Sequence, residues 1–461
     1  MRRVRAARRT TLALAVAALA AAALAPAGAA VRATSPAVPP PPSDVLPASS
    51  GATTAAVPAA DARVAAGVKA ALGVAAVGSD TTAYVLDVGT GKPVYAAGQT
   101  RPQIPASALK VLTAATALVA LGPQTRLRTT VVPGAAKGEV VLVGAGDATL
   151  TRSASARTWP AGQTARPASI AALAAATAAA LKKAGTTTVV VHVDDSLFTG
   201  PTTAPGWPST FTSGGVVAPV TALSVDQGRA AAGVGSGPRT KDPSIEAGRL
   251  LAERLRALGI KVGGTVVRVT APKGAEPIAT VASPTVADLV ERMLTQSDDD
   301  LAEALAHLAG GKLGGAASFA GGAKATLKVV GDLGVTTTGA VVVDGSGLSA
   351  RNAVSAATLV GLLRTLATTD DPSLSAAVTG LAVAGATGTL SDRFTGPGTT
   401  AGRGTVLAKT GTLTGVNALV GLVLDPAGRL RAFAFLENRS PGPQAVARTA
   451  LDRAAAVVAA G

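Results

Sequence analysis

The sequence predicts a mixed fold of helices and strands, of the α/β (α+β) class, with more than one domain. Short β-like runs alternate with helical stretches along most of the chain, and loops rich in Gly, Pro and Thr separate them. The 461 residues leave room for two or three domains. Hydrophobic residues make up 48% of the chain and aromatic residues only 2%, so we expect a sizeable core that depends on aliphatic packing.

The first folded segment is predicted to begin near Asp61 with a helix. A strand over 81–88, a turn at Gly89-Thr90-Gly91-Lys92 and a return strand over 93–96 follow. A second helix is predicted over 107–121, because apolar residues recur there at helical spacing. These residues are Leu109, Leu112, Ala115 and Val119.

The remaining elements follow the same patterns. Residues 126–281 alternate predicted strands with predicted helices, with strands at 140–143, 188–193 and 264–269 and helices at 170–182 and 245–258. Helices then dominate, at 286–293, 301–308, 316–333 and 354–366. Three strands (404–409, 417–424 and 430–436) and a last helix (444–460) end the chain, and Asp425-Pro426-Ala427-Gly428 is suited to the turn between the last two strands.

Residues 1–30 have the order of a secretory signal peptide. An arginine cluster precedes an apolar run over 12–25, and small residues follow it. The run is short for a membrane-spanning helix, so both cleavage and retention as an anchor are open; Arg8-Arg9 is a weak indication of twin-arginine export. Residues 31–60 are rich in Pro, Ala, Ser and Thr and are predicted to form an extended linker. We therefore expect an exported, extracytoplasmic protein, in the cell envelope or secreted.

Composition excludes several classes of site. The absence of cysteine excludes disulfides, thiolate metal sites and thiol nucleophiles, and two isolated histidines argue against a zinc site. The formal net charge of +15 suits an anionic envelope polymer, a membrane surface or nucleic acid, and simple solubility explains it equally well. No nucleic-acid motif accompanies the charge, and no phosphate-binding loop matches.

Three short segments carry residues suited to acyl transfer through a serine. In Ser107-Ala-Leu-Lys110 a spacing of three residues on a helix places hydroxyl and amine on one face, a nucleophile beside its base. In Lys409-Thr410-Gly411-Thr412, at the end of a predicted strand, small side chains let a substrate backbone lie along the strand while the lysine offers a cation to a carboxylate. Ser297-Asp298-Asp299 lies between two predicted helices. The three segments together, in this order, are far more specific than any one alone.

With these three elements the chain resembles the penicillin-recognising active-site-serine enzymes, which carry Ser-x-x-Lys, Ser-x-Asn and Lys-Thr-Gly. The 190 residues from Ser107 to Ser297 narrow the resemblance to the class C low-molecular-mass penicillin-binding proteins, the D-alanyl-D-alanine carboxypeptidase/endopeptidase type, with a large insertion at this place. The resemblance covers nearly all of the chain from residue 61 to its end. Other stretches that agree are 144–150, 193–198, 222–226, 344–349 and 388–394.

The resemblance implies a fold, an activity and partners. The fold would be of the penicillin-binding-protein/β-lactamase-like transpeptidase type, an antiparallel sheet flanked by helices. Residues 61–125 and 282–461 would form this discontinuous catalytic domain, with 126–281 as the insert. The activity would be that of a serine-type D-Ala-D-Ala carboxypeptidase/endopeptidase acting on peptidoglycan stem peptides through an acyl-enzyme. β-Lactams would be covalent inhibitors, and no metal or organic cofactor would be needed.

The resemblance also assigns roles to single residues. Four residues would be catalytic. Ser107 would be the nucleophile and Lys110 its base. Ser297 would relay a proton to the leaving amine, and Lys409 would orient Ser297. Four would bind substrate, namely Asp299, Thr410, Gly411 and Thr412. The backbone N–H groups of Ser107 and Thr412 would form the oxyanion hole.

Asp299 departs from the family pattern, which has Asn at this position. An ionised carboxylate cannot donate a hydrogen bond to the substrate carbonyl, and it favours the charged form of Lys110, which weakens the base. We therefore expect lowered acylation or a shifted pH optimum. Two alternatives stay open: a catalytically silent envelope protein that binds peptidoglycan, with Asp299 as its main support, and a β-lactamase, against which the long insertion argues.

Other polar residues are predicted to be structural. His192 and His307 lie in apolar runs without a Gly-x-Ser-x-Gly motif, so a structural role is expected for both. Trp207 is expected to anchor packing, and Asp344-Gly345-Ser346-Gly347 to form a tight loop or, as the alternative, a rim of the substrate cleft. Glu303 fits helix N-terminal electrostatics as readily as catalysis. Asp147 and Asp194-Asp195 are expected to end strands.

Overall fold

The computed structural model describes residues 56–153, 165–230, 237–313 and 315–461. The predicted signal peptide and most of the predicted linker lie outside these residues. Helix α2 (Ala56–Leu72) begins inside the linker, so the predicted linker end at residue 60 is wrong by a few residues. Pro58 does not prevent this start, because the first turn of a helix needs no backbone N–H donor.

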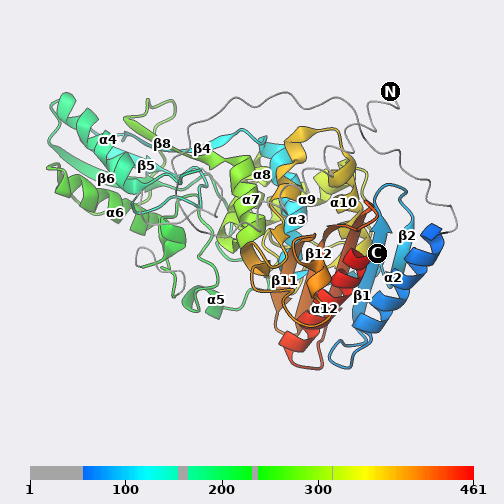
Figure 1. The fold of residues 1–461 in the computed structure, drawn as a ribbon. Coiled ribbons are helices and arrows are strands. Elements are labelled where there is room, and N and C mark those ends of the chain that lie inside the picture. Colours follow the sequence, from blue (N-terminus) through cyan, green and yellow to red (C-terminus); the bar gives the residue numbers. More distant parts are fainter. Residues whose placement is uncertain (1–55, 154–164, 231–236, 314) are drawn as a thin grey trace, which may run out of the picture.

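A six-stranded antiparallel sheet, built from both ends of the described chain, is the centre of the larger part of the molecule (Figure 1). Strand β1 pairs along its whole length with β13, from Thr81 opposite Glu437 to Asp87 opposite Arg431. The strand order is β10-β11-β12-β13-β1-β2. The bounds are β1 Thr81–Asp87, β2 Pro93–Ala97, β10 Ala382–Val383, β11 Val406–Leu413, β12 Val416–Leu424 and β13 Leu430–Asn438.

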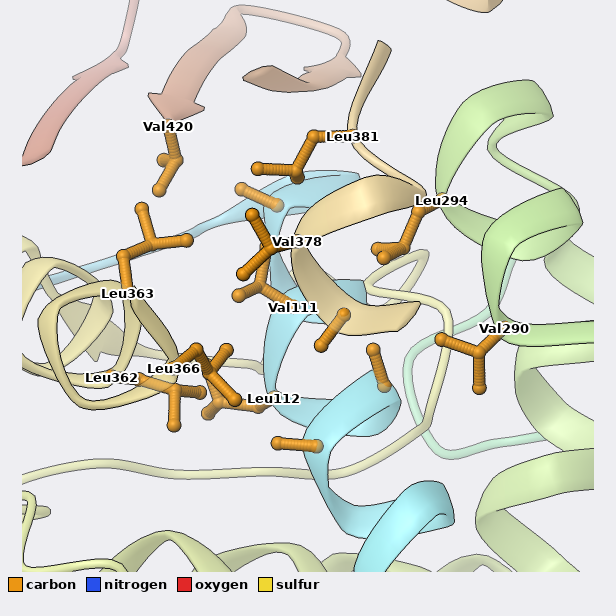
Figure 2. Close-up of a cluster of buried hydrophobic side chains, with 14 of the residues drawn as sticks. Val111, Leu112, Val290, Leu294, Leu362, Leu363, Leu366, Val378, Leu381 and Val420 are labelled. Atoms are coloured by element: carbon orange, nitrogen blue, oxygen red, sulfur yellow. The ribbon is translucent and has the colours of Figure 1, made fainter. Parts of the chain in front are cut away.

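Helices cover both faces of this sheet. On one face α2 and α12 (Gln444–Ala460) share a buried cluster with Phe433 and Phe435 of β13. On the other face a larger aliphatic cluster joins the sheet to α3, α7, α8, α10 and α11, and Figure 2 shows part of it, with Val420 of β12 above side chains from four helices. The bounds are α3 Lys110–Leu121, α7 Val286–Gln296, α8 Asp299–Lys312, α9 Phe319–Asp332, α10 Ala356–Thr368 and α11 Ala376–Thr379.

A second sheet lies to one side of the first, on the left in Figure 1, and has the order β7-β6-β5-β4-β8. It is mixed, because β4 pairs antiparallel with β5 and β8, whereas β6 pairs parallel with β5 and β7. Helices α4 and α6 share its buried cluster. The bounds are β4 Arg126–Pro133, β5 Glu139–Val143, α4 Ile170–Lys183, β6 Thr188–Asp194, α5 Thr210–Ser213, α6 Pro243–Ala257, β7 Lys261–Gly263 and β8 Ala279–Thr285. Strand β8 thus crosses the insert boundary expected at residue 281.

The strand predicted over 264–269 is wrong. The edge strand of the second sheet is β7, which ends before Gly264, and beyond it only an isolated bridge joins Arg268 to Val193. Gly264 has a φ of +66°, in the left-handed region, which breaks the extended backbone. A two-stranded ribbon of β3 (Pro102–Gln103) and β9 (Val354–Ser355) completes the described strands. None of the described helices has both the length and the apolar character needed to cross a membrane.

Candidate active site

Ser107 lies in a single 3-10 turn, η1 (Ala106–Leu109), that leads directly into α3. The preceding residue, Ala106, has a φ of +47°, a left-handed conformation that is uncommon outside glycine and is found where surrounding structure imposes it. One helical turn later Lys110 is fully buried, and its Nζ donates a hydrogen bond to Ser107 Oγ at 3.0 Å. The first predicted pair, nucleophile and base, is therefore in contact.

Lys110 Nζ has two further partners besides Ser107. It donates to Asp299 Oδ1 at 2.6 Å and to the Ser346 carbonyl at 2.6 Å. These three acceptors match the three N–H bonds of an ammonium group. Burial raises the pKa of Asp299, while the positive charge of Lys110 acts in the opposite direction. The base thus forms an ion pair with the residue that departs from the family pattern.

Ser297 lies at the junction of α7 and α8, where it ends α7 in a left-handed conformation with a φ of +56°. The next residue, Asp298, caps α8 by accepting the N–H of Leu301, and its carboxylate also contacts Arg292 and Gln227. These contacts fix the junction and so the position of Ser297. Its Oγ accepts a hydrogen bond from Lys409 Nζ at 2.9 Å.

Lys409 lies on β11, is fully buried and also donates to the carbonyl of Thr410 at 2.8 Å. Burial and the charge of Lys110 hold the pKa of Lys409 well below its usual range, although Asp299 acts in the opposite direction. Burial and a neighbouring ammonium thus outweigh the one nearby carboxylate. The second pair, Ser297 and Lys409, is suited to passing a proton.

Gly411 lets β11 lie against the segment that carries the nucleophile. A Cβ at this position would stand 2.6 Å from the carbonyl oxygen of Pro105, two residues before Ser107. Next to it, Thr410 Oγ1 is 2.9 Å from Thr389 Oγ1, and Thr412 pairs across the sheet with Asn417. The strand and the nucleophile are therefore neighbours.

The three motif segments meet at one open cleft of about 900 Å³. Five of the eight predicted site residues line it, whereas Lys110 and Lys409 are buried and contact the lining serines. The five are Ser107, Ser297, Asp299, Thr410 and Thr412. Separation of the nucleophile from the strand of Lys409 would have excluded the enzymatic interpretation; the structure brings them together.

Comparison with known proteins identifies the family. The model of the D-Ala-D-Ala carboxypeptidase 3 (S13) family matches residues 64–238 and 229–458. The chain belongs to this family. A carboxypeptidase of Mycobacterium tuberculosis is 37% identical over 433 residues, which cover 92% of this chain and 89% of the relative. The carboxypeptidase DacB of Mycolicibacterium smegmatis is 37% identical over 82% of this chain and 80% of its own.

A solved structure shows that the fold is shared. Penicillin-binding protein 4 (dacB) of Haemophilus influenzae aligns with a TM-score of 0.70 and 20% identity, over 84% of this chain and 97% of its own. At that identity the likeness shows the fold, which is the one that the resemblance implied: a penicillin-binding-protein type with an antiparallel sheet flanked by helices.

Further residues of this S13 chain line the cleft, and the sequence analysis did not single them out for it. Phe211 and Val216, from the segment 210–217 around α5, form part of its wall, and Arg448 and Asp452 of α12 form another part. Arg393 joins that second part through two hydrogen bonds to Asp452, at 2.6 and 3.1 Å. No local motif marks Phe211 or Arg448, since only the folded chain places them on the same cleft as Ser107.

Trp207 and the two histidines do not line the cleft of this S13 chain. Trp207 packs edge-on against Phe319 and donates its Nε1–H to Asp344 at 2.8 Å, as expected of an anchor. Burial lowers the pKa of His307 to about 4, and its Nδ1 faces the carbonyl of Glu303. The described residues contain no cluster of His, Asp or Glu suited to a metal ion.

Proposed function

We propose that this protein hydrolyses the terminal D-Ala-D-Ala bond of peptidoglycan stem peptides through an acyl-enzyme on Ser107. The observation that carries the proposal is the 3.0 Å contact between Lys110 Nζ and Ser107 Oγ, with a second serine–lysine pair on the same cleft. Membership of a D-Ala-D-Ala carboxypeptidase family and the names of the mycobacterial relatives support it.

The residues divide the reaction between two serine–lysine pairs. In its neutral form Lys110 accepts the proton of Ser107, whose oxygen attacks the scissile carbonyl carbon. Backbone N–H groups of Ser107 and Thr412 would stabilise the oxyanion, with donors of this kind contributing on the order of 3 kcal/mol each. Ser297, bonded to Lys409, gives its proton to the departing amine of D-alanine, and the proton that Lys110 took from Ser107 passes to Ser297 and restores its hydroxyl. Lys110, neutral again, then takes a proton from the water that attacks the ester carbonyl, and returns this proton to Ser107 Oγ when the ester bond breaks.

β-Lactams would acylate the same serine, because their strained amide takes the place of the scissile bond. A structure of the Haemophilus penicillin-binding protein 4 was determined in complex with a β-lactam. The cleft of about 900 Å³ is roomy enough for a drug-sized ligand.

One observation favours a second candidate, a silent protein that binds peptidoglycan without cleaving it. Asp299 is 2.6 Å from Lys110 and stabilises the ammonium form, in which the lysine cannot accept a proton. Against this, the rest of the machinery is present and in contact. We propose that Asp299 slows acylation and does not abolish it.

Release of D-alanine from a pentapeptide stem tests the proposal. The wild-type protein should release D-alanine, Ser107→Ala should release none, and Ser297→Ala should be slower because the leaving amine loses its proton donor. A cross-linked dimer as a second substrate would reveal endopeptidase activity. Binding of the wild type to peptidoglycan without release from either substrate would instead establish the silent binder.

We also propose that the protein is exported and works outside the cytoplasmic membrane. The proposal rests on residues 1–30 and on a peptidoglycan substrate, which lies outside that membrane. Cell fractionation with N-terminal mass analysis tests it: recovery from the envelope or the medium supports export, and a cytoplasmic pool with an intact N-terminus contradicts it.

A further inference from the structure

Glu303 is a fully buried carboxylate that lies behind the proposed active site and has no part in the mechanism so far. It stands four residues after Asp299 on α8, so both side chains lie on the same face of the helix. Asp299 contacts Lys110 directly, whereas Glu303 contacts the backbone of the loop that lies beside Lys110.

The two carboxylate oxygens of Glu303 bind two consecutive backbone N–H groups. Oε2 accepts from Gly345 and Oε1 from Ser346, each at 2.8 Å. The carbonyl groups of the same two residues point toward α3. The Ser346 carbonyl accepts from Lys110 Nζ, and the Gly345 carbonyl accepts from Thr113 Oγ1, both at 2.6 Å. Two adjacent residues thus connect Glu303 to the catalytic helix.

The loop that contains these residues has little freedom to move. The Asp344 carboxylate accepts the N–H groups of Gly347 and Ser349, the side-chain amide of Asn352 and the indole N–H of Trp207. A Cβ on Gly347 would stand 1.9 Å from the carbonyl oxygen of Ala106, so the loop packs directly on the backbone beside the nucleophile. The position of the Ser346 carbonyl is therefore transmitted to Lys110 and Ser107.

A buried carboxylate here needs a reason, because burial disfavours its charge. Burial, and then the neighbouring Asp344 carboxylate, raise the pKa of Glu303 to about 8. Both oxygens of Glu303 nevertheless accept a backbone N–H, an arrangement that favours the ionised form and opposes the effect of burial on its pKa. It also polarises the peptide groups, which makes the Ser346 carbonyl a stronger acceptor for Lys110, since hydrogen bonds in a chain strengthen one another.

We propose that Glu303 is a positioning residue for acylation: through the backbone of Gly345 and Ser346 it holds the Ser346 carbonyl on Lys110 and so keeps the amine in reach of Ser107 Oγ. The inference rests on the proposed function. It assigns to Glu303 no contact with substrate, so its effect should fall on the rate of acylation and leave binding unchanged.

Glu303→Gln tests the inference, because the amide keeps the shape but directs an N–H toward one of the two donors. The measurement is acylation by a fluorescent penicillin at varied concentration, which separates the initial Kd from the acylation rate constant. We expect the rate constant to fall about 10- to 100-fold, as for loss of a charge-assisted hydrogen bond, with Kd changed less than about threefold. The matched control is Asp300→Asn, which changes another carboxylate of α8, one that accepts the N–H of Ala218 and does not bond the 344–349 loop, and it should change the rate constant less than about threefold.

An unchanged rate constant in folded Glu303→Gln, an equal loss in Asp300→Asn, or a loss expressed in Kd would overturn the inference. If Glu303→Gln does not fold, Thr113→Val weakens the same loop from α3 and should lower the rate constant about 3- to 10-fold; wild-type acylation there would overturn it too.

A second readout separates this inference from the proposed function. Hydrogen–deuterium exchange of the 344–349 segment requires no acylation and should accelerate at the amides of Gly345 and Ser346 in Glu303→Gln. Failure of the wild type to react with penicillin refutes the proposed function, whereas unchanged exchange at these two amides refutes the role of Glu303.

Discussion

Replacing Asp299 with Asn tests the residue in which this chain departs from its family. The ion pair joins Asp299 Oδ1 to Lys110 Nζ at 2.6 Å. Coulomb's law at an effective dielectric constant of about 20 gives an upper bound of about 6 kcal/mol for two unit charges at that distance. The cost of removing the Asp299 carboxylate from water offsets part of this energy, although 21% of the side chain stays exposed. A net stabilisation of the ammonium by about 1.5–3 kcal/mol, typical of a hydrogen bond to a charged group, is the more realistic value.

Because 1.36 kcal/mol corresponds to one factor of ten, Asp299→Asn should raise the acylation rate about 10- to 100-fold at neutral pH. The neutral amide no longer holds the lysine in its charged form, and its NH₂ group can donate to the substrate carbonyl. Stopped-time labelling with a fluorescent penicillin, quantified on gels at neutral pH, measures this rate.

Asp300→Asn is the matched control for this experiment. This substitution removes a carboxylate from the residue that follows Asp299 on α8. The Asp300 carboxylate accepts the N–H of Ala218 and approaches Arg239, and it does not contact Lys110. We expect its acylation rate to stay within about threefold of the wild type. An unchanged or lower rate in Asp299→Asn, with Asp300→Asn folded and active, would refute the reasoning about the base.

Three further predictions concern stability and the loop beside the nucleophile. Gly347→Ala should lower acylation at least tenfold, because its Cβ would meet the Ala106 carbonyl at 1.9 Å and its φ is +84°; wild-type labelling would contradict this. Burial raises the pKa of Asp147 to about 6, so its contribution to stability is full below its ordinary pKa of 3.8 and is lost as the pH rises through 6. Urea unfolding from pH 4 to 8 should therefore show Asp147→Asn gaining up to about 3 kcal/mol relative to the wild type toward alkaline pH, and parallel curves would count against it. Leu112→Ala, in the fully buried cluster of Figure 2, should lower the free energy of unfolding by about 2–5 kcal/mol in the same assay, and a loss below about 1 kcal/mol would mean that the core collapses around the gap.

The sequence predicted most of the reactive chemistry, because that chemistry is carried by short local patterns. The spacing of Ser107 and Lys110 determines their contact on one helical face, and the 190-residue gap before Ser297 indicated a large insert. The pairing of Asp299 with Lys110 followed from the family pattern and is present at 2.6 Å. The domain boundaries remain predictions, and the experiments above test the residue roles.

Features that depend on contacts distant in sequence could not be predicted. Glu303 reads as an ordinary residue in the first turns of a helix until the fold places it against backbone amides 42 and 43 residues later. Phe211, which lines the cleft, belongs to a Gly- and Pro-rich segment whose sequence shows no helical or strand periodicity. The prediction of a strand over 264–269 was wrong. Its apolar residues fit the pattern of a strand, but Gly264 has a positive φ and interrupts the extended backbone.

Mapping the site of a covalent penicillin adduct tests the central claim most directly. Ser107 carries the hydroxyl that the buried amine of Lys110 contacts at 3.0 Å and should activate. Incubation of the intact protein with penicillin, followed by mass spectrometry, should show one added penicilloyl group on the peptide that contains Ser107, and none in Ser107→Ala. An adduct on another serine, or its persistence in Ser107→Ala, would contradict the account.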